Sequence, residues 1–97
     1  MNRTMLRDLV TEVLNEVQEA SGREPSAITE ATVPTRDLVD FDSVNAVEAC
    51  AILCDRLTRV GISNDIPVDV FIVDGEMVAS VASIVAAVMS LVEETTE

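Results

Sequence analysis

The sequence contains no histidine, no lysine, no tyrosine and no tryptophan, and phenylalanine occurs only twice. Most of the side chains that act as general bases or amine nucleophiles are therefore missing. No nucleophile–base pair and no complete set of metal ligands can be assembled, unless carboxylates alone suffice. The composition argues against a hydrolase or a metalloenzyme and predicts a protein that is not an enzyme.

Positive charge is scarce as well. Six arginines stand against eighteen acidic residues, so the net charge is −12. This charge disfavours binding to nucleic acids and to anionic membranes. It favours encounters with basic protein surfaces, because opposite fields raise association rates. The same acidity can also serve only to keep a small protein soluble.

The length of 97 residues predicts one domain, residues 1–97, with a modest core and no deep active-site cleft. The first residues lack the apolar segment of a signal peptide, which predicts a cytoplasmic location. An uncharged run, residues 77–92, would extend about 24 Å as a helix, less than the roughly 30 Å of a bilayer core. We therefore expect a buried helix there and no membrane span.

Cysteine is present at two positions, Cys50 and Cys54, four residues apart on one face of a predicted helix. A disulfide between them would distort that helix, so we expect two reduced, buried thiols. Two thiols without a histidine make a weak metal site, and no metal is expected.

Apolar periodicity predicts a first helix over residues 4–20, with one buried stripe: Leu6, Val10, Val13, Leu14 and Val17. Gly22 follows it in the position that glycine favours after a helix. Residues 22–42 lack a sustained period and contain prolines, which predicts a long structured loop without a further regular element. Its apolar residues are expected to pack beneath it: Ile28, Val33, Leu38 and Phe41.

A second helix is predicted over residues 43–60, ended by Gly61. Its expected buried face consists of Val44, Val47, Ala51, Cys54 and Leu57, widened by Cys50, Ile52 and Leu53. The side chains expected to face solvent are Asn45, Glu48, Asp55, Arg56 and Arg59.

Residues 68–78 allow two interpretations. They can form a hairpin with a turn at Asp74-Gly75, or a short third helix that begins after Pro67. An isolated hairpin is only marginally stable, so we favour a short helix over residues 67–73. A final helix is predicted over residues 77–94. The expected fold is all-α: a small four-helix bundle with three long helices, one short third helix and a long loop between helices one and two.

Ser43 stands where the acidic loop meets the second helix. A hydroxyl at a helix entrance lies beside free backbone N–H groups and the positive end of the dipole, which suits a phosphate. In a simpler interpretation, Ser43 or Asp42 caps the helix, worth about 1 kcal/mol.

Residues 37–48, Asp-Leu-Val-Asp-Phe-Asp-Ser-Val-Asn-Ala-Val-Glu, resemble the prosthetic-group motif of acyl carrier proteins. That family shows a leucine, often a glycine, and then Asp-Ser-Leu with Val-Glu three residues further on. The resemblance extends over about residues 5–92. It includes an acidic first helix, a long loop, the serine at the start of the second helix, and Ile66-Pro67 before a short third helix.

The resemblance implies that Ser43 receives 4′-phosphopantetheine from a phosphopantetheinyl transferase, with coenzyme A as donor. The arm would hold acyl or aminoacyl groups as thioesters. Asp42 would contribute to transferase recognition or metal positioning, or act only as a cap. Partner enzymes that load, condense or transfer acyl groups would present basic patches to the second helix and the preceding loop. The residues expected to meet them are Asp40, Asp42, Val44, Glu48 and Asp55.

Several positions depart from the family pattern. Val44 replaces the usual leucine, Asn45 a frequent acid, and Cys54 occupies a position that is often acidic in fatty-acid carriers; residues 59–65 lengthen the second loop. These departures favour a specialised, stand-alone carrier over the housekeeping role in fatty acid biosynthesis. Lipid, polyketide and other acyl pathways remain open, and a monomer is expected because such a carrier visits several enzymes.

Two further interpretations follow from the apolar interior. An acyl chain could enter between helices past Val47, Ala51, Val81 and Ala82, or the core could stay closed. Alternatively, the protein is a small acidic helical adaptor that binds a partner helix through apolar grooves, with Ser43 acting only as a helix cap.

Overall fold

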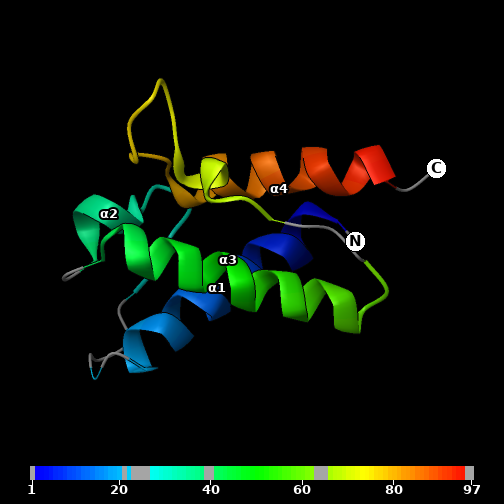
Figure 1. The fold of residues 1–97 in the computed structure, drawn as a ribbon, viewed down its shortest axis with the longest axis horizontal. Helices are drawn as coiled ribbons and strands as arrows, with labels where there is room; N and C mark the ends of the chain where they lie inside the picture. The colour runs from blue at the N-terminus through cyan, green and yellow to red at the C-terminus, as the bar shows by residue number, and fades with distance from the viewer. Residues whose placement is uncertain (1, 21, 23–26, 39–40, 63–65, 96–97) are drawn as a thin grey trace.

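The computed structural model describes residues 2–20, 22, 27–38, 41–62 and 66–95. The regular secondary structure of these residues is helical, and they contain no strand. The elements are α1 (Arg3–Ala20), α2 (Pro34–Asp37), α3 (Ser43–Arg59), the 3₁₀ turn η1 (Val68–Phe71) and α4 (Val81–Thr95). Figure 1 shows the three long helices with α2 beside the start of α3. The predicted all-α class is confirmed for this part of the chain.

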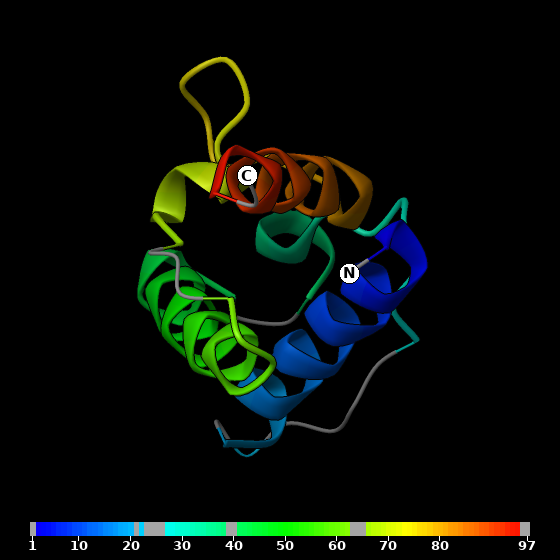
Figure 2. The ribbon, with the colours of Figure 1, turned by 90° about the vertical axis from the view of Figure 1, so that its right-hand side faces the viewer.

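Helix α1 contacts both α3 and α4, and η1 contacts α3 and α4 on the other side of the core (Figure 2). The buried side chains of α1 include the whole predicted stripe, which is therefore confirmed: Leu6, Val10, Val13, Leu14 and Val17. The stripe was readable because charged residues occupy the rest of the helix surface. None of the helices in the described part of the chain has the length and apolar character that a bilayer crossing requires.

Helix α3 buries a face that overlaps only in part with the predicted one, since Cys50, Leu53 and Leu57 are buried as expected. Its buried residues are Asn45, Ala46, Ala49, Cys50, Leu53 and Leu57. Val44 and Val47, which were expected in the core, are 71% and 55% exposed, and Ala51 is exposed as well. Residues 46–54 are apolar nearly all round the helix, so periodicity allowed two stripes that differ by one residue, or about 100° of rotation.

The predicted long loop contains a helical turn, α2, that the sequence analysis did not foresee. Pro34 occupies its first position, where the missing N–H has no intrahelical role. The Asp37 carboxylate accepts a 2.8 Å hydrogen bond from the Val33 amide, and this bond holds the pKa of Asp37 below its ordinary value. One turn was too short to show a period.

The apolar residues of this connection behave largely as expected. Val33, Leu38 and Phe41 are buried, and Ile28 is half-buried against the core. The ring of Phe41 contacts that of Phe71 in η1, with 5.9 Å between centroids and a tilt of 31°. Such a pair contributes about 0.5–1.5 kcal/mol beyond area burial. It joins the segment before α3 to the segment before α4.

Helix α4 begins at Val81, four residues later than predicted. The amides of Val81 and Ala82 donate to the carbonyls of Thr32 and Glu30, at 2.8 and 3.0 Å. The Ser83 amide donates to the Ser80 hydroxyl at 3.2 Å. Because carbonyls of the long connection accept hydrogen bonds from these first amides, the helix can begin at Val81 without a preceding helical turn to supply acceptors. The Thr35 hydroxyl also donates to the Met77 carbonyl.

The segment before α4 combines both interpretations of the sequence. The 3₁₀ turn η1 is shorter than the predicted helix over residues 67–73. After it, Val73 and Glu76 exchange backbone hydrogen bonds of 2.8 and 3.0 Å across Asp74 and Gly75. Both turn residues have positive φ, 53° and 81°, as the tightest hairpin turns require. This turn projects from the helices in Figure 1.

The buried face of α3 predicts that Leu53→Ala and Val47→Ala will have different effects on stability. We expect Leu53→Ala to lower the free energy of unfolding by about 2–5 kcal/mol, because Leu53 is buried in the core. Val47→Ala, the matched control on the exposed face, should change it by less than about 0.5 kcal/mol. Urea denaturation followed by far-UV circular dichroism measures both. Equal losses would contradict the assignment of the buried face.

Candidate functional site

The candidate site lies at the entrance to α3, where Asp42 caps the helix. Its carboxylate accepts hydrogen bonds from the Val44 and Asn45 amides, at 3.0 and 3.2 Å. The Asn45 side chain in turn accepts a 3.3 Å bond from the Asp42 amide, which completes a capping box. Asn45, predicted to face solvent, is instead buried because of this role.

Ser43 is the first residue of α3, and its side chain is exposed. The capping role belongs to Asp42, so the hydroxyl of Ser43 is not needed to begin the helix. Within the described ranges, that hydroxyl has no hydrogen-bond partner. The helix therefore presents an exposed hydroxyl close to its own positive end.

The predicted partner-binding residues are only partly brought together. Val44 and Glu48 are exposed and lie one turn apart beside Ser43. Asp55 is exposed three turns along α3 and forms a 3.0 Å ion pair with Arg59. Asp40 lies outside the described residues. Val47, which was not among the predicted partner-binding residues, joins Val44 and Glu48 in one exposed surface, and only the rotation of α3 in the structure reveals it.

Arg56 was expected in solvent but lies half-buried between helices. Its guanidinium forms ion pairs with Glu12, at 3.3 Å, and with Glu16. It therefore ties α3 to α1.

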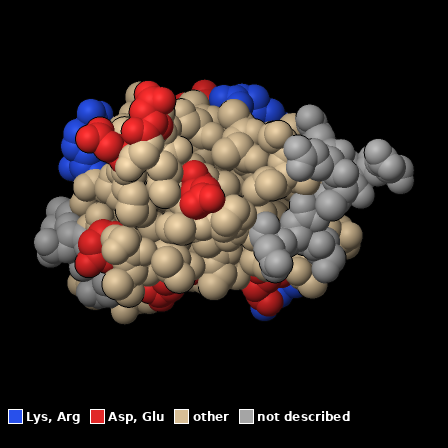
Figure 3. Space-filling view, turned by 45° about the horizontal axis from the view of Figure 1, so that its top comes forward, with Lys and Arg blue, Asp and Glu red and all other residues tan. Residues whose placement is uncertain are grey.

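Charge is distributed unevenly over the molecule. Figure 3 shows a face that consists mostly of uncharged side chains, with one acidic patch near its middle and further acidic and basic groups toward its edge. Residues 81–92 of α4 contain no charged residue.

Neither cysteine forms a disulfide. Cys50 is buried as predicted, whereas Cys54 is only half-buried. The Cys50 thiol donates a 3.6 Å hydrogen bond to the Pro67 carbonyl, and its burial raises the pKa to about 11. Across the described ranges, no three Cys, Asp or Glu side chains gather closely enough to hold a metal ion.

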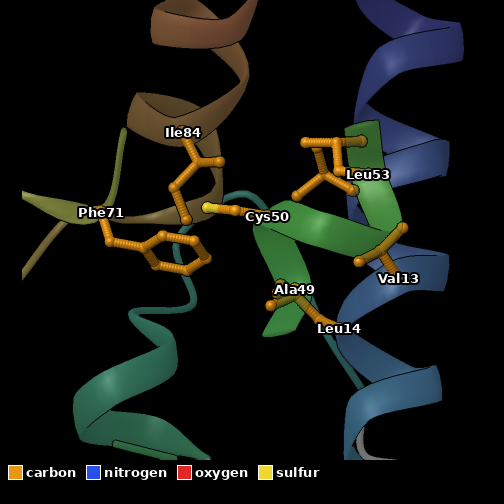
Figure 4. A pocket seen from close by; sticks show the side chains of 8 residues that line it. Val13, Leu14, Ala49, Cys50, Leu53, Phe71 and Ile84 are labelled. Carbon is orange, nitrogen blue, oxygen red and sulfur yellow. The ribbon is translucent and has the colours of Figure 1, made fainter. Parts of the chain in front are cut away.

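A small apolar cavity lies in the core between α1, α3, η1 and α4, where the sulfur of Cys50 points toward Phe71 and Ile84 (Figure 4). Its volume is about 10 Å³, the space of about one water molecule. The remaining lining residues are Val10, Val13, Leu14, Ala49 and Leu53. The core around it is well packed.

A larger groove lies on the surface between α3 and the segment leading into η1. Its volume is about 390 Å³, and it is lined by Val47, Cys50, Ala51, Cys54, Ile66 and Val68. The residues predicted to line a path for an internal acyl chain do not lie together. Val47 and Ala51 line this outer groove, whereas Val81 is buried in α4. The four residues therefore do not enclose one internal channel.

Comparison with known proteins identifies no family for this chain: no family model, no curated protein and no solved structure matches it significantly. The site has to be judged from its own geometry.

The capping geometry predicts unequal effects of two neighbouring alanine substitutions. Asp42→Ala should lower the free energy of unfolding by about 1 kcal/mol, because two amides lose their acceptor. Ser43→Ala should change it by less than about 0.5 kcal/mol. Asp42→Asn keeps an acceptor oxygen and serves as the control. A larger loss for Ser43→Ala than for Asp42→Ala in urea denaturation would show that the serine is the cap.

The two thiols should differ in reactivity toward iodoacetamide at pH 8. Cys54 should be alkylated in the folded protein and Cys50 should not, because a pKa of about 11 leaves roughly one Cys50 in a thousand as thiolate. Peptide mass analysis locates the label, and unfolded protein, alkylated at both positions, is the control. Since folding raises the pKa of Cys50 from 9.0 to about 11, stability should fall as the pH rises through this window.

Proposed function

We propose that this protein is a carrier that holds acyl or aminoacyl groups as thioesters on a 4′-phosphopantetheine arm attached to Ser43. The observation that supports this most directly is the division of roles between Asp42 and Ser43. The aspartate satisfies the first amides of α3, and the serine beside it is exposed with a hydroxyl that the fold does not use. A modified serine therefore costs the fold no hydrogen bond.

The residues at the start of α3 fit such a group. A phosphodiester on Ser43 would be negatively charged and would lie close to the positive end of the helix dipole. No base is needed in the chain, because a transferase would supply the chemistry of attachment from coenzyme A. When attached, the arm supplies a flexible thiol that forms and releases thioesters. Asp42 would then orient Ser43 by fixing the helix entrance.

Partner enzymes would approach the surface formed by Val44, Val47 and Glu48. The two valines offer exposed apolar area next to the attachment point, and the glutamate adds negative charge. A complementary partner has an apolar contact flanked by arginine or lysine, since opposite charges steer encounters. Phosphopantetheinyl transferases and acyl-loading, condensing or acyl-transfer enzymes are the proposed partners, and a monomer would serve all of them.

The packing of the core limits the size of the acyl group that the protein could hold inside. Three long helices with a short connecting turn are compatible with a carrier, but the core cavity has the volume of about one water molecule. A long acyl chain could enter only if the helices part. We therefore favour a short acyl or an aminoacyl cargo.

The adaptor hypothesis is favoured by one observation, the exposure of Val44 and Val47, because exposed apolar side chains often mark protein contacts. It requires no modification of Ser43. The same surface would then bind a partner directly, and Ser43→Ala would leave that binding unchanged.

The test is to incubate the protein with coenzyme A and a broad-specificity phosphopantetheinyl transferase and to weigh the intact chain. The expected result is a gain of one phosphopantetheinyl group in the wild type and none in Ser43→Ala. Ser80→Ala, which changes a serine near the start of α4, is the matched control and should be modified normally. An unmodified wild type, or a gain that persists in Ser43→Ala, would refute the carrier function.

A further inference from the structure

We propose that Cys54 forms a reversible internal disulfide with the terminal thiol of the arm on Ser43, inside the groove between α3 and η1. This inference rests on the proposed function and assigns a second thiol position to the same site. It depends on three observations: the shared face of α3, the distance along the helix, and the exposure of Cys54 to the groove.

Ser43, Val47 and Cys54 share one face of α3. Their separations of four and eleven residues correspond to rotations that differ by about 40° or less at 3.6 residues per turn. Val47 and Cys54 both line the groove, which therefore begins one turn after Ser43. Ile66 and Val68 form its opposite wall. An arm that follows this apolar groove from Ser43 is led along α3 toward Cys54.

The length of the arm matches the distance. Eleven residues of α-helix span about 16.5 Å. From the serine oxygen to its sulfur, the arm contains about fourteen bonds, and three backbone-type bonds span about 3.5 Å, so its extended length is about 16 Å. The terminal sulfur can therefore reach Cys54 but not much farther along the helix. Because both thiols belong to one molecule, their effective concentration is in the millimolar range or above.

Cys50 also lines the groove, but it is the poorer partner. Its side chain is 5% exposed, and its sulfur points into the core toward Phe71 and Ile84 (Figure 4). Burial raises the pKa of Cys50 to about 11, which leaves little of the reactive thiolate near neutral pH. Cys54 is half-buried and can react without unfolding of α3.

The reaction is thiol–disulfide exchange with a small disulfide such as oxidised glutathione. The thiolate of the arm attacks one glutathione sulfur, its S–S bond breaks, and one glutathione leaves as thiolate. The Cys54 thiolate then attacks the sulfur of the arm and displaces the second glutathione. The two protons lost by the protein thiols end on the two glutathione thiolates. The protein is oxidised by two electrons, and one oxidised glutathione is reduced to two thiols.

The internal disulfide would prevent acyl groups from being loaded onto the arm. A thiol held in a disulfide cannot accept an acyl group, and reduction would restore it. An arm that already holds a thioester has no free thiol and would be excluded from the reaction. The internal disulfide would thus form only on the unloaded carrier.

The experiment uses the full chain, first modified with coenzyme A and a transferase and then treated at low protein concentration with oxidised glutathione. Intact mass should show the loss of two hydrogen atoms relative to the modified protein, without added glutathione. Cleavage after Glu48 should fail to separate the Ser43 fragment from the Cys54 fragment until dithiothreitol is added. Cys50→Ala should behave as the wild type.

The matched control moves the thiol around the helix at nearly constant distance. In the double variant Cys54→Ala with Asp55→Cys, the new thiol lies about 100° away on the exposed side of α3. We expect it to form the internal disulfide at least about tenfold more slowly than the wild type, because orientation as well as proximity sets the rate. Cys54→Ser should yield only the mixed disulfide of the arm with glutathione.

The outcomes separate the two proposals. Failure to gain the phosphopantetheinyl group refutes the carrier function, and the disulfide falls with it. A normal gain followed only by glutathione adducts, by a bridge to Cys50, or by equal rates for Cys54 and the Asp55→Cys control overturns this inference alone. A mass loss of two hydrogen atoms that disappears in Cys54→Ser supports it.

Discussion

The capping box at the start of α3 is the interaction on which the rest of the site depends. The carboxylate of Asp42 bonds the amides of Val44 and Asn45, and the side chain of Asn45 bonds back to the amide of Asp42. Asn45 is buried, so the rotation of α3 about its axis places this side of the capping box against the core. That rotation exposes Ser43, Val44 and Val47 together while Leu53 and Leu57 fill the core.

A second set of backbone bonds holds the remaining parts around this helix. The connection before α3 supplies the carbonyls of Glu30 and Thr32 to the first amides of α4, and the hydroxyl of Thr35 bonds the Met77 carbonyl. The middle of the connection is thereby tied to the start of α4 and to the segment that precedes it. Glu30 and Thr32 of this segment supply acceptors to the first amides of α4, so the connection acts as part of the N-terminal cap of that helix.

How much of this could be predicted from the sequence depends on how strongly each segment separates polar from apolar residues. In α1 charged residues surround a single stripe, and the buried set was predicted in full. In α3 apolar residues occur on nearly every side, so Cys50, Leu53 and Leu57 were correctly predicted to be buried, whereas the burial predicted for Val44, Val47 and Ala51 was wrong. The start of α4 depends on carbonyls about fifty positions earlier, which no local pattern reveals. Ser43 was singled out correctly as lying at a helix entrance, but its separation from the capping role required coordinates.

The contact between Phe41 and Phe71 has a practical consequence. These are the two aromatic residues of the chain, one just before Ser43 and the other in η1, with 5.9 Å between their centroids. Fluorinated phenylalanine would therefore give a ¹⁹F spectrum of two resonances, both belonging to this pair. Each would sense the ring current of the other, so a small displacement of the α3 entrance relative to η1 would be visible without any further label.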